Sequence, residues 1–131
     1  MATLSFRVDL TTGGRLGPGK RRLLELIDEL GSISAAGRAL DMSYRRAWLL
    51  VEEVNGSFRE PLVEKAPGGS GGGGAVLTAA GHNVLTCLAD IDSVTAAAAA
   101  ASLARLDALA APKRATPKKS AGGRNATGRQ V

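Results

Sequence analysis

The hydrophobic positions change their period along the first part of the chain, and each period predicts a different element. Over residues 4–10 apolar side chains alternate with polar ones, which is typical of a half-buried β-strand. Between Pro18, which suits a first helical turn, and Gly31, a natural stop, the apolar residues fall at helical spacing. Residues 11–17 have the composition of a loop. The apolar positions are Leu4, Phe6, Val8 and Leu10 in the strand and Leu23, Leu26, Ile27 and Leu30 in the helix.

The next segment, GSISAAGRALDMSYRRAWLLVEEVN from Gly31 to Asn55, predicts two short helices joined by a tight turn at Asp41 and Met42. The small residues of the first helix allow a second helix to cross it closely, as a helix-turn-helix requires. We expect Ser43 to cap the second helix, which would end near Asn55. The inward-facing positions of the second helix would be Tyr44, Ala47, Trp48, Val51, Val54 and Phe58. The candidate caps of the first helix are Ser32 and Ser34.

The second of these helices carries two arginines in its first turn, the part of a recognition helix that usually reaches base edges. Arg45 and Arg46 could each bond guanine O6 and N7 together, or grip a phosphate. Glu52 and Glu53 would repel DNA, so we expect them to point away or to lie beyond the groove. The basic residues at 20–22, in the first turn of the preceding helix, allow two interpretations, a solvated face or a phosphate contact.

Two short apolar runs at 62–65 and 75–78 flank the sequence APGGSGGGG and predict a β-hairpin where the wing of a winged helix belongs. Its glycines would let backbone amides approach a DNA phosphate closely. The alternative is a flexible hairpin loop that makes no contact. Thr78 would cap a helix from about Ala79 to Leu109, roughly 45 Å long. We expect its alanine-rich outer half to pair with a second copy, with a solvent-exposed helix as the alternative. No apolar run approaches the roughly 18 residues needed to cross a membrane.

The charge of the chain is concentrated at one end. The 131 residues carry a net charge of +5 and a pI near 10.0, which favours an acidic partner. Six of the 17 basic residues and no acidic residue lie in 112–131, so the remaining 11 basic and 12 acidic residues give a net charge of −1. From 111 onward the composition predicts a disordered basic tail, which would add non-specific DNA affinity or simply aid solubility.

The sequence offers little for catalysis. Aromatic residues make up only 3% of the chain, so the core must be built from Leu, Val, Ile and Ala. His82 and Cys87 are the only residues of their kinds; we expect His82 at the surface near the wing base and Cys87 in the core. A lone cysteine, with a start that does not resemble a signal peptide, favours a reducing cytoplasm. We therefore expect no enzyme activity, no metal and no cofactor.

Taken together, these residues resemble the N-terminal DNA-binding domain of the molybdate-responsive transcriptional regulators, the ModE family. The resemblance covers roughly residues 15–95. It rests on GSISAAGRALDMSYRRAW at 31–48, EVN at 53–55 and LVEKAPGGSGGGGAVLTAAG at 62–81. The first half also resembles, more generally, the helix-turn-helix of LysR-type regulators.

The resemblance implies a mainly α fold with a small β wing, a winged helix-turn-helix followed by a long C-terminal helix. It also implies sequence-specific binding to DNA as a dimer, and control of molybdate transport or molybdenum-enzyme genes. Members of the family carry C-terminal molybdate-binding modules; the residues after the long helix cannot build one, so we expect no small-molecule sensor in this chain. Trp48 is expected to be structural. The implied DNA contacts are Ser34, Ser43, Tyr44, Arg45 and Arg46 in the helices and Lys65, Gly68, Gly69, Ser70 and Gly71 in the wing.

The predicted organisation has three parts: a winged helix-turn-helix at 1–78, a dimerisation helix at 79–110 and a basic tail at 111–131. The leading hypothesis is a cytoplasmic homodimer that binds double-stranded DNA and no membrane. The alternative is a winged-helix protein-interaction module that forms mixed dimers with a full-length regulator, which is compatible with the net charge of −1 outside the tail.

Overall fold

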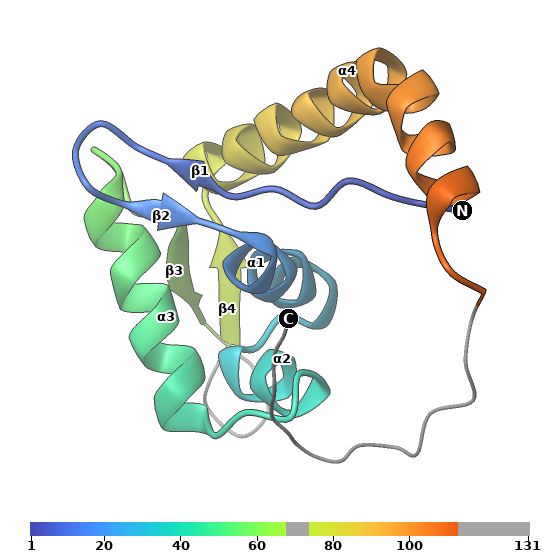
Figure 1. The fold of residues 1–131 in the computed structure, drawn as a ribbon. Helices are drawn as coiled ribbons and strands as arrows, with labels where there is room; N and C mark the ends of the chain where they lie inside the picture. Colours follow the sequence, from blue (N-terminus) through green and yellow to red (C-terminus); the bar gives the residue numbers. More distant parts are fainter. Residues whose placement is uncertain (68–73, 113–131) are drawn as a thin grey trace.

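The computed structural model describes residues 1–67 and 74–112 of the chain. Its elements are β1 (Val8–Asp9), β2 (Arg15–Leu16), α1 (Pro18–Leu30), α2 (Ile33–Ala39), α3 (Tyr44–Ser57), β3 (Val63–Ala66), β4 (Gly74–Leu77) and α4 (Ala79–Leu109). Helices α1 to α3 and two antiparallel hairpins form one body, from which α4 extends (Figure 1). The N-terminal segment runs alongside α4, and the Ala2 amide donates to the Asp107 carboxylate at 2.6 Å.

The predicted first strand is much shorter than residues 4–10. Only Val8–Asp9 forms β1, and it pairs with Arg15–Leu16, a segment that the sequence predicted as loop. Leu16 is buried at 5% exposure, so the pairing delivers an apolar side chain to the core. Leu4, predicted on the inner face of the strand, is instead 45% exposed. A strand this short forms only with its hairpin partner, and alternation alone does not identify that partner.

Helix α1 has the predicted bounds. Pro18 lies in its first turn, and Gly31 ends it with φ of 71°, where its amide donates to the Ile27 carbonyl at 2.8 Å. The predicted apolar face is correct except for Leu30, which is 47% exposed. The buried residues of this helix are Leu23, Leu24, Leu26 and Ile27.

Helices α2 and α3 cross closely, as predicted from their small residues. A Cβ atom on Gly37 would lie 3.1 Å from the Cβ of Ala47, so a larger residue at position 37 would push the helices apart. Ser32, rather than Ser34, caps α2 by accepting from the Ala35 amide at 3.0 Å. Ser43 caps α3 as predicted. The tight crossing fixes which face of α3 points into the body.

Helix α3 continues through Gly56 to Ser57, beyond its predicted end. Asn55 does not stop the helix; its side chain accepts from the Leu62 and Val63 amides at 2.8 and 3.1 Å and donates to the Val63 carbonyl at 3.0 Å. These bonds satisfy backbone groups at the start of β3. Asn55 therefore fixes the hairpin against α3.

The predicted hairpin forms, with Val63 opposite Leu77 and Ala66 opposite Gly74. Thr78 caps α4 as predicted, accepting from the Gly81 amide at 3.0 Å, and also donates to the Pro61 carbonyl at 2.7 Å. The hairpin base and the start of α4 are thus one hydrogen-bonded unit. The glycine-rich tip at 68–73 and the predicted tail from 113 lie outside the described residues.

The core consists of aliphatic side chains, as the composition predicted. Helix α4 contributes Leu88 to it, at 3% exposure. Cys87 is exposed, so its predicted core position is wrong; Leu88, its neighbour on the helix, takes the inward direction. His82 lies at the surface as expected. The buried core residues are Leu16, Leu23, Leu24, Leu26, Ile27, Ala36, Ala47, Val51, Val54, Leu62, Val63, Ala75, Leu77 and Leu88.

Helix α4 is long and apolar enough to cross a membrane by length and composition alone. The prediction that no apolar run approaches this length is therefore wrong, because alanines outweigh the scattered polar residues in a window average. A single such helix is weak evidence for a membrane span, since the mostly buried core helix of a soluble protein has the same length and composition; only 6% of the apolar stretch of α4 is buried. The helix also carries Asp90 and Asp92, and Asp92 is ion-paired to α1.

Candidate nucleic-acid interface

The first turn of α3 is the most exposed part of the helix-turn-helix. Ser43, Tyr44, Arg45 and Arg46 are all exposed, and the Ser43 hydroxyl accepts from the Arg46 amide at 3.1 Å. Buried Ala47 marks the inner face of the helix. At 100° per residue, Arg45 lies about 200° from Ala47 and thus points outward.

Two aromatic residues predicted to face inward do not. Tyr44 is 56% and Trp48 is 37% exposed, whereas Ala47 is fully buried. The α2–α3 crossing at Gly37 admits only a small side chain at the centre of the contact, so the larger residues lie at its edges. Trp48 lines a groove of about 250 Å³ between α3 and β3, and its expected structural role stays a prediction.

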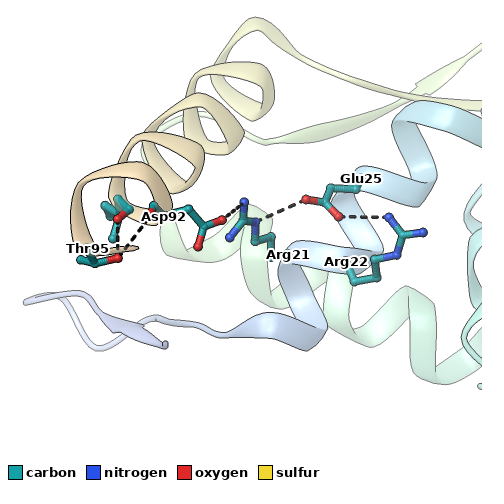
Figure 2. A network of polar contacts seen from close by, with 6 residues as sticks. Arg21, Arg22, Glu25, Asp92 and Thr95 are labelled. Carbon is teal, nitrogen blue, oxygen red and sulfur yellow. Dashed lines mark hydrogen bonds and ion pairs between the residues drawn. The ribbon is translucent and has the colours of Figure 1, made fainter. Parts of the chain in front are cut away.

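Arg45 and Arg46 form no ion pair within the described part of the chain. The basic residues in the first turn of α1 differ, because each lies near a carboxylate. Lys20 lies 3.0 Å from Glu53, Arg21 lies 2.6 Å from Asp92, and Arg22 lies 3.1 Å from Glu25. Figure 2 shows Asp92, Arg21, Glu25 and Arg22 as a row of alternating charges. The hydrogen bond from Arg21 to Asp92 raises the pKa of Arg21 above its ordinary value.

These ion pairs bear on the two interpretations of the basic turn at 20–22, a solvated face or a phosphate contact. A phosphate would have to displace an existing carboxylate partner, so that turn is a poorer anion site than the first turn of α3. It is not a freely solvated face either, because Lys20 and Arg21 are only 18% and 23% exposed. The geometry therefore assigns these residues to intramolecular pairing.

The two acidic residues of α3 take different directions. Glu53 lies on the flank that faces α1 and is paired with Lys20. Glu52 follows Arg45 by seven residues and lies on the same side of the helix, roughly 10 Å further along. Glu52 therefore lies on the outward face, like Arg45. Only its distance along the helix keeps it away from the first turn.

The β3–β4 hairpin lies beside α3, and Lys65 is exposed on β3 and lines the groove between them. Ser34 lies on α2, where its hydroxyl accepts from Arg38 Nη1 at 2.8 Å. Lys65 therefore lies beside the middle of α3, whose residues Trp48, Val51, Glu52 and Asn55 line the same groove. The predicted wing contacts Gly68, Gly69, Ser70 and Gly71 lie outside the described residues.

Leu49 is 43% exposed on the outward side of α3, and the sequence alone predicts no role for it. Its position four residues after Arg45 indicates that the two side chains share a helix face. Within the ranges 1–67 and 74–112, no group of three or more His, Cys, Asp or Glu side chains could hold a metal ion.

A crossed pair of helices, preceded by α1 and followed by a β-hairpin, defines a winged helix-turn-helix domain. No protein-family model matches the chain. Over 82 residues it is 44% identical to the molybdenum-pterin-binding protein MopB of Rhodobacter capsulatus. Over 68 residues it is 43% identical to the DNA-binding transcriptional dual regulator ModE of Escherichia coli K12.

These alignments cover 63% and 52% of this chain, but the chain spans only 30% of MopB and 26% of that ModE. The chain is homologous to the N-terminal ~70 residues of ModE and Mop proteins, and it is related to the DNA-binding domain of ModE regulators. The relatives are regulators and binding proteins rather than enzymes.

Among solved structures, the chain resembles full-length CbnR in complex with its target DNA. The TM-score is 0.49 at 22% identity, over 66% of this chain and 28% of that one. The fold class follows from the order of helices and strands described above.

Proposed function

We propose that this chain is a sequence-specific DNA-binding regulator whose α3 enters the major groove. The observation that carries the proposal is the contrast between two basic helix starts. The α1 residues are paired with carboxylates, whereas Arg45 and Arg46 are exposed and have no carboxylate within 4.0 Å in the described part of the chain. Arginine fits guanine O6 and N7 through two parallel hydrogen bonds.

The remaining contacts position the helix on the duplex. Ser43 and Tyr44 lie beside the arginines at the start of α3, and Ser34 lies on the helix that would cross the backbone. Lys65 would meet a phosphate next to the wing. The proposed wing contacts to phosphates are Gly68, Gly69, Ser70 and Gly71.

We propose further that residues 1–78 bind DNA, that 79–110 form a homodimer and that 111–131 act as a basic tail. Helix α4 supports the dimer because it leaves large apolar side chains uncovered, with Leu106 61% and Leu109 80% exposed. An apolar groove of about 610 Å³ also runs between the N-terminal segment and α4. A two-fold dimer would read two half-sites about one helical turn of DNA apart, or a multiple of it.

The names of two relatives, the molybdenum-pterin-binding protein MopB and a molybdenum transport protein ModE of Azotobacter vinelandii, support a role in the control of molybdate transport or molybdenum-enzyme genes. The chain would act in the cytoplasm, and its only macromolecular ligand besides a second copy would be double-stranded DNA.

The test is selection from a random pool of duplex DNA at physiological salt, with the full chain and with residues 1–111. A two-fold-symmetric motif from both proteins supports the proposal. Binding that requires the tail and shows no sequence preference contradicts it, since a basic tail alone gives non-specific, salt-sensitive affinity.

A second function, a protein-interaction module that forms mixed dimers with a full-length regulator, is favoured by the exposed apolar surface of α4. This module would bind a full-length relative in solution and recover no motif on its own.

A further inference from the structure

Leu49 has no structural task in the folded chain. It is 43% exposed, and it is absent both from the buried core and from the partly buried residues that pack against it. Its neighbour Trp48 differs, because Trp48 lines the groove against β3. Leu49 thus presents an apolar side chain at the surface of α3, one turn after the exposed arginines.

The outward face of α3 places Leu49 directly after Arg45. Residues four apart on a helix share a face and are separated by roughly 6 Å along the axis. This distance corresponds to one or two base-pair steps of about 3.4 Å. Glu52 follows on the same face, so Leu49 lies between an arginine and a glutamate, with the partly exposed Trp48 at its side.

We infer that Leu49 is a specificity-determining residue that contacts the 5-methyl group of a thymine, one or two base pairs from the guanine bonded by Arg45. The inference rests on the proposed function. Thymine is the base that presents an apolar group in the major groove, and apolar side chains recognise it there. A single leucine flanked by charged residues matches a single methyl group, whereas a protein partner would require a wider apolar surface.

The experiment uses the full chain and its selected DNA site. Each thymine is replaced in turn by uracil, which removes the methyl group and leaves the hydrogen-bonding groups intact. The parent protein should lose about fourfold in affinity at one thymine of each half-site, the effect expected for burying one methyl-sized group. Leu49→Ala should bind the thymine and uracil sites equally.

Leu30→Ala is the matched control, because Leu30 has a similar exposure of 47% but lies at the end of α1. It should keep the full preference for thymine. Leu49→Gln provides a second variant of nearly unchanged length and should also lose the preference. Circular dichroism of both Leu49 variants should match the parent, since each residue is a good helix former.

Three results would overturn the inference. If Leu49→Ala keeps the parent's preference for thymine, or if the parent shows no such preference, Leu49 does not read the methyl group, although the proposed function stands. If selection recovers no motif at all, both the proposed function and this inference fail.

Discussion

The guanidinium of Arg21 on α1 lies 2.6 Å from the carboxylate of Asp92 on α4. This contact joins the helix-turn-helix body to the long helix, one turn beyond the buried Leu88 (Figure 2). Arg21 is 23% exposed, so its charge is partly desolvated and depends on its carboxylate partners. The direction of α4 relative to α1 therefore depends on a polar contact as well as on apolar packing.

Asp92→Asn should lower the free energy of unfolding by up to about 1 kcal/mol, the upper range for a partly exposed ion pair. Urea unfolding measures the change. Asp90→Asn is the matched control, because Asp90 is exposed on the same helix and makes no ion pair in the described ranges. Equal effects of the two substitutions would show that the Arg21 contact does not stabilise the fold.

Arg45→Ala should weaken binding to the selected DNA site by about 1–3 kcal/mol if the side chain bonds a guanine at two points. Titration of labelled duplex at fixed salt measures the loss, and a site with the guanine replaced should show no further loss. Arg22→Ala removes the same charge from a residue already paired with Glu25 and should leave affinity nearly unchanged. Comparable losses for both variants would point to a general charge effect instead.

Glu52→Gln should tighten DNA binding by about twofold, because it removes a negative charge roughly 10 Å from the proposed base contacts. Asp90→Asn changes the net charge of the chain equally but lies on α4, and screening should make its effect small. Fluorescence anisotropy at two salt concentrations distinguishes these outcomes. No difference between the two variants would place Glu52 away from the DNA.

The starts of α1, α3 and α4 and the end of α1 could be predicted because their signals are local. Pro18 and Gly31 delimit α1, and Ser43 and Thr78 cap α3 and α4 with their own hydroxyls. The N-terminal strand could not be predicted in the same way, since it exists only by pairing with Arg15–Leu16. Cross-strand pairing is a tertiary property that periodicity does not encode.

The candidate site shows the same division. The sequence predicted Arg45 and Arg46 in the first turn of a helix, and the structure places both there, at the surface. The exposure of Tyr44 could not be predicted, because it depends on where α2 crosses α3. Glu53 and Asp92, which pair with Lys20 and Arg21, lie on other helices and could not be predicted either. The DNA contacts themselves stay a prediction.

Arg7 and Asp9 lead to a prediction about pH. Arg7 Nε and Nη2 donate to the two Asp9 oxygens at 2.7 and 3.0 Å, and these hydrogen bonds lower the pKa of Asp9 below its ordinary value. Because the pKa of Asp9 is lowered in the folded chain, the pair stabilises β1 at pH values above about 3.9, the pKa of an aspartate in the unfolded chain. This stabilisation is lost as the pH falls through the lowered pKa of the folded chain. Carboxyl NMR titration should show the low pKa, and Arg7→Ala should return it to the ordinary value. An unchanged pKa in the variant would contradict the pairing.

Gly81→Ala and Gly56→Ala should change stability in opposite directions, although both replace a glycine within a helix. A Cβ on Gly81 would overlap the backbone carbonyl oxygen of Leu62 and lie 3.2 Å from the Cβ of Leu77. Since no side-chain rotation can relieve a clash with backbone, the hairpin base must move, at a cost of about 1–3 kcal/mol. A Cβ on Gly56 meets nothing within 4 Å, so there alanine should add up to about 1 kcal/mol through its helix propensity.

Urea midpoints of the two variants provide the measurement, with the parent chain as reference. Gly81→Ala should also weaken DNA binding more than its loss of stability explains, because Leu62 begins the segment that Asn55 fixes against α3. If both variants are stabilised by the same amount, the start of α4 has room to move. The close contact at Gly81 would then not determine where the hairpin lies beside α3.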